Sequence, residues 1–256
     1  MSDQINWDQV PAAIWRARSG QLRAVTRLDP IALDSLLGIE RQKTLIVQNT
    51  ERFLNREPAN NALLWGARGT GKSSIIKALL NRYFKQGLRI IQIDKEDLRD
   101  LTEIVDTLRE LPQRFIVFCD DLSFDEGDGT YKALKSVLEG SIEVPPENIL
   151  IYATSNRRHL MPEYMSDNQA SKVNETEIHH AEAIEEKISL SDRFGLWLSF
   201  YAINQDQYLE IVDLLFGDVS NRPALHAEAI RFALSKGGRS GRAAQQFYKA
   251  YSGLLV

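Results

Sequence analysis

The chain has almost no cysteine and no long apolar run. Its 256 residues include 1 cysteine, so no disulfide can form within the chain. No stretch reaches the ~18 apolar residues of a membrane span. The first residues, 1–4, also lack the basic and apolar regions of a secretory signal. We therefore expect a folded protein of the reducing cytoplasm that has no membrane partner.

Charge of either sign is not in large excess. The 31 lysines and arginines oppose 35 acidic residues, and the net charge is −4. This balance excludes a protein that coats nucleic acid by its overall charge. However, residues 9–28 carry four arginines and no acid, and residues 219–256 carry six basic residues and one acid. The basic ends indicate a solvated face with ligands for an internal phosphate, or alternatively contacts to an external polyanion.

Short runs of branched and aromatic residues alternate with helical patterns along most of the chain. The five runs that read as strands cover residues 61–65, 88–93, 114–119, 148–153 and 196–201. Strands separated by helices predict a parallel sheet with helices on both faces, which is the α/β class. Ligands of such sheets bind at the carboxyl ends of the strands.

The pattern changes after the last predicted strand. Three helical stretches follow with no strand between them, at residues 207–216, 224–234 and 243–251. We therefore divide the chain into an N-terminal arm at 1–32, an α/β part at 33–203 and a helical lid at 204–256. The weak periodicity of residues 164–176 predicts a mobile loop. In the arm, Trp7 and Trp15 fall near helical spacing, and we expect them to pack against the body or a neighbouring subunit. Base stacking on nucleic acid is the alternative, because four arginines lie among and after them.

A glycine-rich loop directly follows the first predicted strand and precedes a helix. Its sequence is Gly66-Ala67-Arg68-Gly69-Thr70-Gly71-Lys72-Ser73, followed by Ser74. It satisfies the P-loop pattern of glycine, four residues, glycine, lysine, and serine or threonine. The glycines let backbone N–H groups turn toward phosphate oxygens. Lys72 would reach the terminal phosphates, and the Ser73 hydroxyl would bind Mg²⁺.

Polar side chains follow the next buried strands. Asp120 and Asp121 end the third predicted strand. Asp120 would bind in the coordination shell of Mg²⁺, and Asp121 would polarise the attacking water. Most ATPases with a P-loop of this kind carry glutamate, which is one methylene longer, at the second position. Asn156 follows the fourth strand and would lie between the P-loop and the aspartates, where it could orient the water or the γ-phosphate.

An arginine precedes the fifth predicted strand, within Ser191-Asp192-Arg193-Phe194-Gly195. We expect Arg193 at the rim on the nucleotide side of the sheet. An arginine there can reach a γ-phosphate bound in a neighbouring subunit.

Together these motifs resemble those of AAA+ ATPases. They correspond to a Walker A motif at 66–73, a Walker B strand ending in Asp120-Asp121, a sensor 1 at Asn156, an arginine box at 191–195, and a sensor 2 at Arg242. The segment around Gly38 and Ile39 matches the one that folds over adenine. The arginine box is similar to that of the Holliday-junction branch-migration motor. The Walker A, Walker B and sensor 1 segments resemble a bacterial AAA+ family catalogued as a domain of unknown function.

This resemblance implies a five-stranded parallel sheet with a small helical lid, and an enzyme that hydrolyses ATP with Mg²⁺. Lys72, Asp121 and Asn156 would be catalytic. Arg193 would act on the ATP of the next subunit, and Arg242 on that of its own chain. Gly38, Ile39 and residues 66–74 would bind the nucleotide. Because ATP would then lie at a subunit interface, the chain would form a homo-oligomeric ring, most often a hexamer.

The resemblance does not identify a substrate. The leading hypothesis is a switch or motor that remodels a macromolecule, with nucleic acid as a candidate through the basic arm and lid. A polypeptide unfoldase is disfavoured, because Asp94-Lys95-Glu96-Asp97-Leu98 lacks the aromatic-apolar-glycine loop of threading rings. A monomeric P-loop phosphotransferase acting on a small acceptor is an alternative. The short Asp121 leaves a third class, an ATP-binding scaffold with little hydrolysis.

Overall fold

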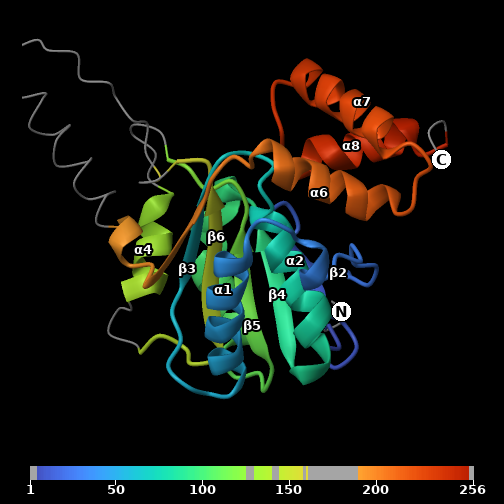
Figure 1. Ribbon diagram of the computed structural model, residues 1–256. Helices are drawn as coiled ribbons and strands as arrows, with labels where there is room; N and C mark the ends of the chain where they lie inside the picture. Colours follow the sequence, from blue (N-terminus) through green and yellow to red (C-terminus); the bar gives the residue numbers. More distant parts are fainter. Residues whose placement is uncertain (1–4, 125–129, 140–143, 158–159, 161–189, 254–256) are drawn as a thin grey trace, which may run out of the picture.

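A computed structural model describes residues 5–124, 130–139, 144–157, 160 and 190–253. It contains a sheet covered by helices on both faces and a cluster of helices above one end of the sheet (Figure 1). The predicted mobile loop at 164–176 lies outside the described residues. Among the residues described, no helix combines the length and apolarity needed to cross a membrane.

Within the described residues the sheet has seven strands, in the order β2-β1-β4-β5-β6-β3-β7. The strands are β1 (Ala12–Arg16), β2 (Gln21–Val25), β3 (Ala62–Gly66), β4 (Leu88–Ile93), β5 (Arg114–Cys119), β6 (Ile149–Ser155) and β7 (Leu196–Phe200). The last five are the predicted strands, and every neighbouring pair among them is parallel. The α/β class with a parallel sheet is therefore confirmed, and the strand count is corrected from five to seven.

The two additional strands come from the N-terminal arm. β1 and β2 form an antiparallel hairpin, and β1 pairs in parallel with β4. The helical spacing expected for the arm is therefore wrong. The side chains of Ala13 and Trp15 enter one core while Ala12 enters the other, which is the two-residue alternation of a strand. A segment of five residues is too short for its apolar spacing to distinguish these two periods.

The arm packs against the body of its own chain, which is one of the two packing arrangements expected above; the other was packing against a neighbouring subunit. The rings of Trp7 and Phe115 meet edge to face with centroids 5.1 Å apart. Trp15 donates a hydrogen bond from Nε1 to Asp100 Oδ2 at 2.8 Å. Both tryptophans are buried.

Two cores lie on opposite faces of the sheet. One face packs against α1 (Glu40–Leu54) and α2 (Lys72–Tyr83), and the other against α3 (Leu101–Leu108) and α4 (Tyr131–Glu139). Three short 3₁₀ helices, η1 (Leu33–Ser35), η2 (Phe84–Gln86) and η3 (Lys95–Asp100), join these elements. Cys119 is buried in the second core, and burial raises the pKa of its thiol.

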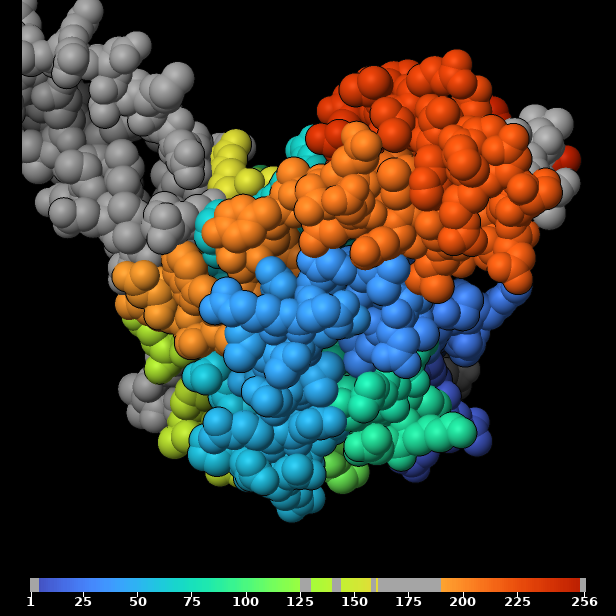
Figure 2. Space-filling model, in the orientation of Figure 1, coloured from blue at the N-terminus to red at the C-terminus, as the bar shows by residue number. Residues whose placement is uncertain are grey.

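The C-terminal helices have a core of their own. They are α6 (Gln205–Phe216), α7 (Arg222–Ser235) and α8 (Gly241–Tyr251). The side chain of Asn204 caps α6 by accepting from the Gln207 N–H, and Gln207 accepts from the Asn204 N–H in return. In Figure 2 this orange to red lid lies directly above the blue segment that contains α1. The buried residues of these helices thus form a core separate from the two sheet cores.

Candidate functional site

The glycine-rich loop leaves the carboxyl end of β3 and enters α2 at Lys72. Gly66 has φ +133°, and a Cβ there would collide with the carbonyl oxygen of Phe200 at the end of β7. The next N–H, that of Ala67, donates to the same oxygen at 3.0 Å. The start of the loop is thus held against β7 by a contact that only glycine permits.

The lysine of the loop is buried, with 7% of its surface exposed. Its Nζ donates to the carbonyl oxygens of Gly66 and Ala67, both at 2.8 Å, and to Asn156 Oδ1 at 3.2 Å. Lys72 therefore lies within the curve of the loop and contacts the predicted sensor residue.

Charges of both signs surround this ammonium group. Burial is the largest influence and lowers the pKa of Lys72, while Asp121 and Asp120 raise it. Arg68 and Arg242 lower it further. Three cations and two carboxylates therefore converge at the carboxyl edge of the sheet, which is the charge pattern needed to bind a polyphosphate together with a divalent metal.

The two residues predicted to hold Mg²⁺ are in contact. The Ser73 Oγ donates to Asp120 Oδ1 at 2.6 Å. Hydroxyl and carboxylate oxygens are ligands that Mg²⁺ prefers, so the donor set fits the metal. Within the described part of the chain, no group of three or more His, Cys, Asp or Glu side chains could hold a metal by itself.

Asn156 joins the lysine to the second aspartate. Its Nδ2 donates to Asp121 Oδ1 at 2.5 Å, while its Oδ1 accepts from Lys72. Asp121 itself has φ +55°, which is uncommon for a residue other than glycine. Lys72, Asn156 and Asp121 thus form one continuous hydrogen-bonded chain.

The lid contributes the opposite wall of the site. The Gly241 N–H, at the start of α8, donates to the Gly69 carbonyl at 3.1 Å. Gly69 has φ +74°, and a Cβ there would lie 3.0 Å from the side chain of Ser240 and 3.3 Å from Arg242 Cβ. The predicted sensor 2 therefore lies against the P-loop of its own chain.

The predicted adenine segment lies between the lid and the loop. A Cβ on Gly38 would be 3.3 Å from Gln207 Nε2, and a Cβ on Gly71 would be 3.4 Å from Ile39 Cδ1. Ala67 and Arg68 are exposed, and Ser74 is half-buried in the first turn of α2. The Thr70 Oγ1 donates to the Ala67 carbonyl at 2.8 Å and closes the loop on itself. All the predicted nucleotide-binding residues thus lie on the loop or beside it.

Arg193 lies elsewhere. It precedes β7, whose first N–H, that of Leu196, donates to the Asn61 carbonyl at the amino end of β3 at 3.1 Å. The guanidinium of Arg193 pairs with Glu139 at the end of α4. The expectation of a position on the nucleotide-side rim is therefore wrong for a single chain. β7 runs parallel to β3, so a residue before it lies at the end of the sheet opposite to the P-loop.

Three residues near the P-loop were not among the predicted site residues: Trp65, Tyr201 and Thr154. Trp65 is half-buried and meets Tyr201 edge to face with centroids 6.3 Å apart. Both rings line a hollow of about 520 Å³ that also contacts Asn156. The side chain of Thr154 bridges the two aspartates. A polar residue at the end of a buried strand could have been recognised in the sequence as a candidate site residue. The partners of Thr154, however, depend on how β5 and β6 pair.

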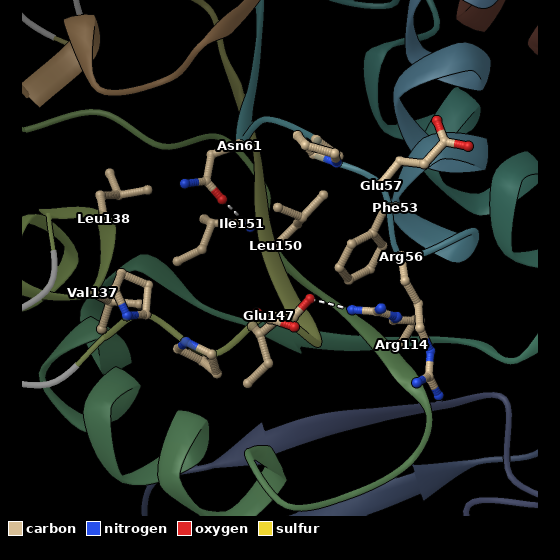
Figure 3. Close-up of a pocket in the computed structure, with 15 residues that line it drawn as sticks. Phe53, Arg56, Glu57, Asn61, Arg114, Val137, Leu138, Glu147, Leu150 and Ile151 are labelled. Carbon is tan, nitrogen blue, oxygen red and sulfur yellow. Dashed lines mark hydrogen bonds between the residues drawn. The ribbon is translucent and has the colours of Figure 1, made fainter.

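A second cavity, of about 370 Å³, lies at the amino ends of β3, β5 and β6 (Figure 3). Arg114 there donates to the Glu147 backbone carbonyl and covers the Phe53 ring with its guanidinium 5.1 Å from the centroid. Asn61 Oδ1 accepts from the Ile151 N–H at 2.8 Å. These polar groups are used by the fold itself.

The structure therefore has an α/β fold of the AAA+ type, with the predicted P-loop at the carboxyl edge of its sheet. The chain belongs to the family described as "Protein of unknown function (DUF815)", whose model matches residues 8–255. No curated protein matches it in sequence.

Solved structures of RuvB from Thermotoga maritima are similar to this chain. One variant matches with a TM-score of 0.53 and 15% identity, covering 87% of this chain and 73% of that one. A second variant gives 0.51 and 15%, covering 86% and 72%. A third structure, titled RuvB Holliday junction branch migration motor, gives 0.47 and 13% over the same shares. The first two matches support the AAA+ fold, and the family match confirms the predicted resemblance to a family of unknown function.

Proposed function

We propose that this protein binds ATP with Mg²⁺ and hydrolyses it, as a homo-oligomeric switch or motor that acts on a macromolecule. The observation that carries this proposal is the pair of contacts from the P-loop to the neighbouring strands. Lys72 reaches Asp121 through Asn156, and Ser73 reaches Asp120 directly. A glycine-rich loop that only formed a turn would not need side-chain hydrogen bonds to the residues that follow β5 and β6.

The roles follow from these positions. Lys72 and the loop N–H groups would hold the β- and γ-phosphates, and Asp121 with Asn156 would hold the attacking water. When bound at Ser73 and Asp120, Mg²⁺ would offset the negative charge of the phosphates. Arg242 would add positive charge from the lid and would report the nucleotide state to α8.

The proposed ring rests on the resemblance of residues 191–195 to the arginine box of AAA+ ATPases. In one chain Arg193 is at the far end of the sheet from the P-loop, so it would act only on the nucleotide of a neighbour. The hollow beside Trp65, Tyr201 and Asn156 opens next to the loop and offers a route for such a side chain.

Nucleic acid is the proposed class of macromolecule. Arg16, Arg18, Arg23 and Arg27 are all exposed on or beside the N-terminal hairpin. Binding through them would weaken steeply as salt rises, because phosphate contacts release counterions. Single-stranded and duplex DNA and RNA, titrated at two salt concentrations, test this part. Absence of binding at low salt, or binding that ignores salt, would contradict it.

The nucleotide proposal is tested by binding of a fluorescent ATP analogue, with and without Mg²⁺, together with phosphate release from ATP. We expect Mg²⁺-dependent binding and turnover. Turnover without dependence on Mg²⁺, or no binding by the folded protein, would contradict the proposal. Tight Mg²⁺-dependent binding with no turnover would favour the scaffold, for which the short Asp121 is the supporting feature. Transfer of phosphate to a small acceptor by a monomer would favour the phosphotransferase.

A further inference from the structure

Thr154 occupies the centre of the catalytic edge. It lies on β6, which is hydrogen-bonded to the P-loop strand β3 on one side and to the aspartate strand β5 on the other. It pairs in register with Leu64 of β3 and is one residue beyond the last pair between β5 and β6, Cys119 with Ala153. Only 1% of Thr154 is exposed. Its hydroxyl must therefore find partners within the protein.

The hydroxyl uses both of its hydrogen-bonding roles on the two aspartates. It donates to Asp120 Oδ1 at 2.5 Å and accepts from the Asp121 N–H at 2.9 Å. The Thr154 carbonyl accepts from the next N–H, that of Leu122, at 2.7 Å. One residue thus holds three consecutive residues after β5. Valine has the same shape but could replace neither side-chain bond.

The first bond orients the proposed Mg²⁺ carboxylate. Asp120 Oδ1 accepts from Thr154 and also from Ser73, at 2.6 Å. One donor lies on β6 and the other on α2. A carboxylate that two such donors already orient loses little rotational freedom when it binds a metal ion. Without the Thr154 hydroxyl, the Asp120 carboxylate could rotate away from Ser73.

The second bond directs the other carboxylate. Asp121 has φ +55°, a conformation that costs free energy for a residue with a Cβ. The bond from its N–H to Thr154 helps to hold this turn, and the turn aims the side chain at Asn156. Aspartate is one methylene shorter than glutamate, so its reach depends more strongly on the direction of the backbone.

We propose that Thr154 is a positioning residue of the nucleotide site, whose hydroxyl sets the directions of Asp120 and Asp121 together. This inference rests on the proposed function, because it assigns the two aspartates to Mg²⁺ and to water.

The test compares Thr154→Val, which removes the hydroxyl, with Thr154→Ser, which keeps it. The first readout is the factor by which Mg²⁺ strengthens binding of the fluorescent ATP analogue, and the second is kcat for phosphate release. Thr154→Val should lower that factor and kcat by roughly tenfold each, the size of one hydrogen bond to a charged group. Thr154→Ser should restore both to within about threefold of the unmodified protein.

A matched control separates positioning from stability. Thr50 is another fully buried threonine, whose hydroxyl donates to the Ile46 carbonyl at 2.7 Å within α1. Thr50→Val should lower the thermal midpoint without changing the effect of Mg²⁺. If Thr154→Val matches the unmodified protein in both readouts, or if the folded Thr154→Ser fails as Thr154→Val does, the proposal is wrong.

The Mg²⁺ readout needs no hydrolysis. If the unmodified protein shows no turnover but Thr154→Val still loses the Mg²⁺ effect, hydrolysis fails and the positioning role stands. If the unmodified protein hydrolyses ATP and Thr154→Val is unaffected in both readouts, the proposed hydrolysis stands and the positioning role of Thr154 fails.

Discussion

The two ends of the sheet each carry a hollow, but their polar groups are arranged differently. At the carboxyl end, side chains from separate elements bind one another, as in the links from Lys72 to Asn156 and from Ser73 to Asp120. At the amino end, Arg114 and Asn61 bind neighbouring backbone groups (Figure 3). At the carboxyl end, where we propose that the nucleotide binds, side chains thus link the P-loop to the segments after β5 and β6. The hollow at the amino end is lined by polar groups that bind backbone.

The largest effect is expected for Arg193→Ala. If Arg193 completes the site of a neighbour, turnover should fall roughly 10³-fold while ATP binding persists. Mixing this variant with Lys72→Ala should restore part of the turnover, because some interfaces would pair an intact loop with an intact arginine. Unchanged turnover in Arg193→Ala would show that the arginine does not complete the site of a neighbour.

Lys72→Ala should remove a central group of the carboxyl end. The loss of one preorganised donor predicts a fall in turnover of roughly 10²-fold or more, with weaker binding of ATP. Phosphate release and titration of the fluorescent analogue measure both quantities. Full activity in this variant would place the chemistry away from the P-loop.

Arg114→Ala should affect stability and not catalysis. The change removes the contacts to the Glu147 carbonyl and the Phe53 ring, and we expect a loss of about 1–2 kcal/mol in the free energy of unfolding. Urea unfolding measures this loss, and phosphate release at a temperature where the variant is folded should be unchanged. A large fall in turnover with unchanged stability would mean that the amino end is functional as well.

The smallest effect concerns a buried phenol on β6 that contacts α1 through Asn49 and Thr50. Burial raises the pKa of Tyr152 from its ordinary value of 10.0 to about 12, while its hydrogen bonds with Thr50 and Asn49 lower it. The folded state therefore retains this proton where the unfolded state releases it. The stability contributed by neutral Tyr152 is present below pH 10.0 and declines as the pH rises toward about 12. Tyr152→Phe should flatten this decline in urea unfolding measured across that range, and an unchanged slope would contradict it.

The sequence predicted the parts of the site that depend on local patterns. The P-loop, the aspartate pair and Asn156 follow strand ends, and parallel strands bring such ends to one edge. The hairpin was missed because Trp7 and Trp15 have apolar neighbours at spacings that suit a helix. Arg193 was misplaced although the predicted parallel sheet already puts a residue that precedes a strand at the amino edge. The role of Thr154 depends on the register between strands, which no local pattern gives.

The central claim is that the carboxyl edge hydrolyses ATP and is completed by a second chain. Turnover per chain, measured as a function of protein concentration with saturating ATP and Mg²⁺, tests it most directly. The account predicts that turnover per chain rises with concentration and levels off as chains assemble. Turnover that is constant from dilute to concentrated protein, from a chain that stays monomeric by light scattering, would contradict it.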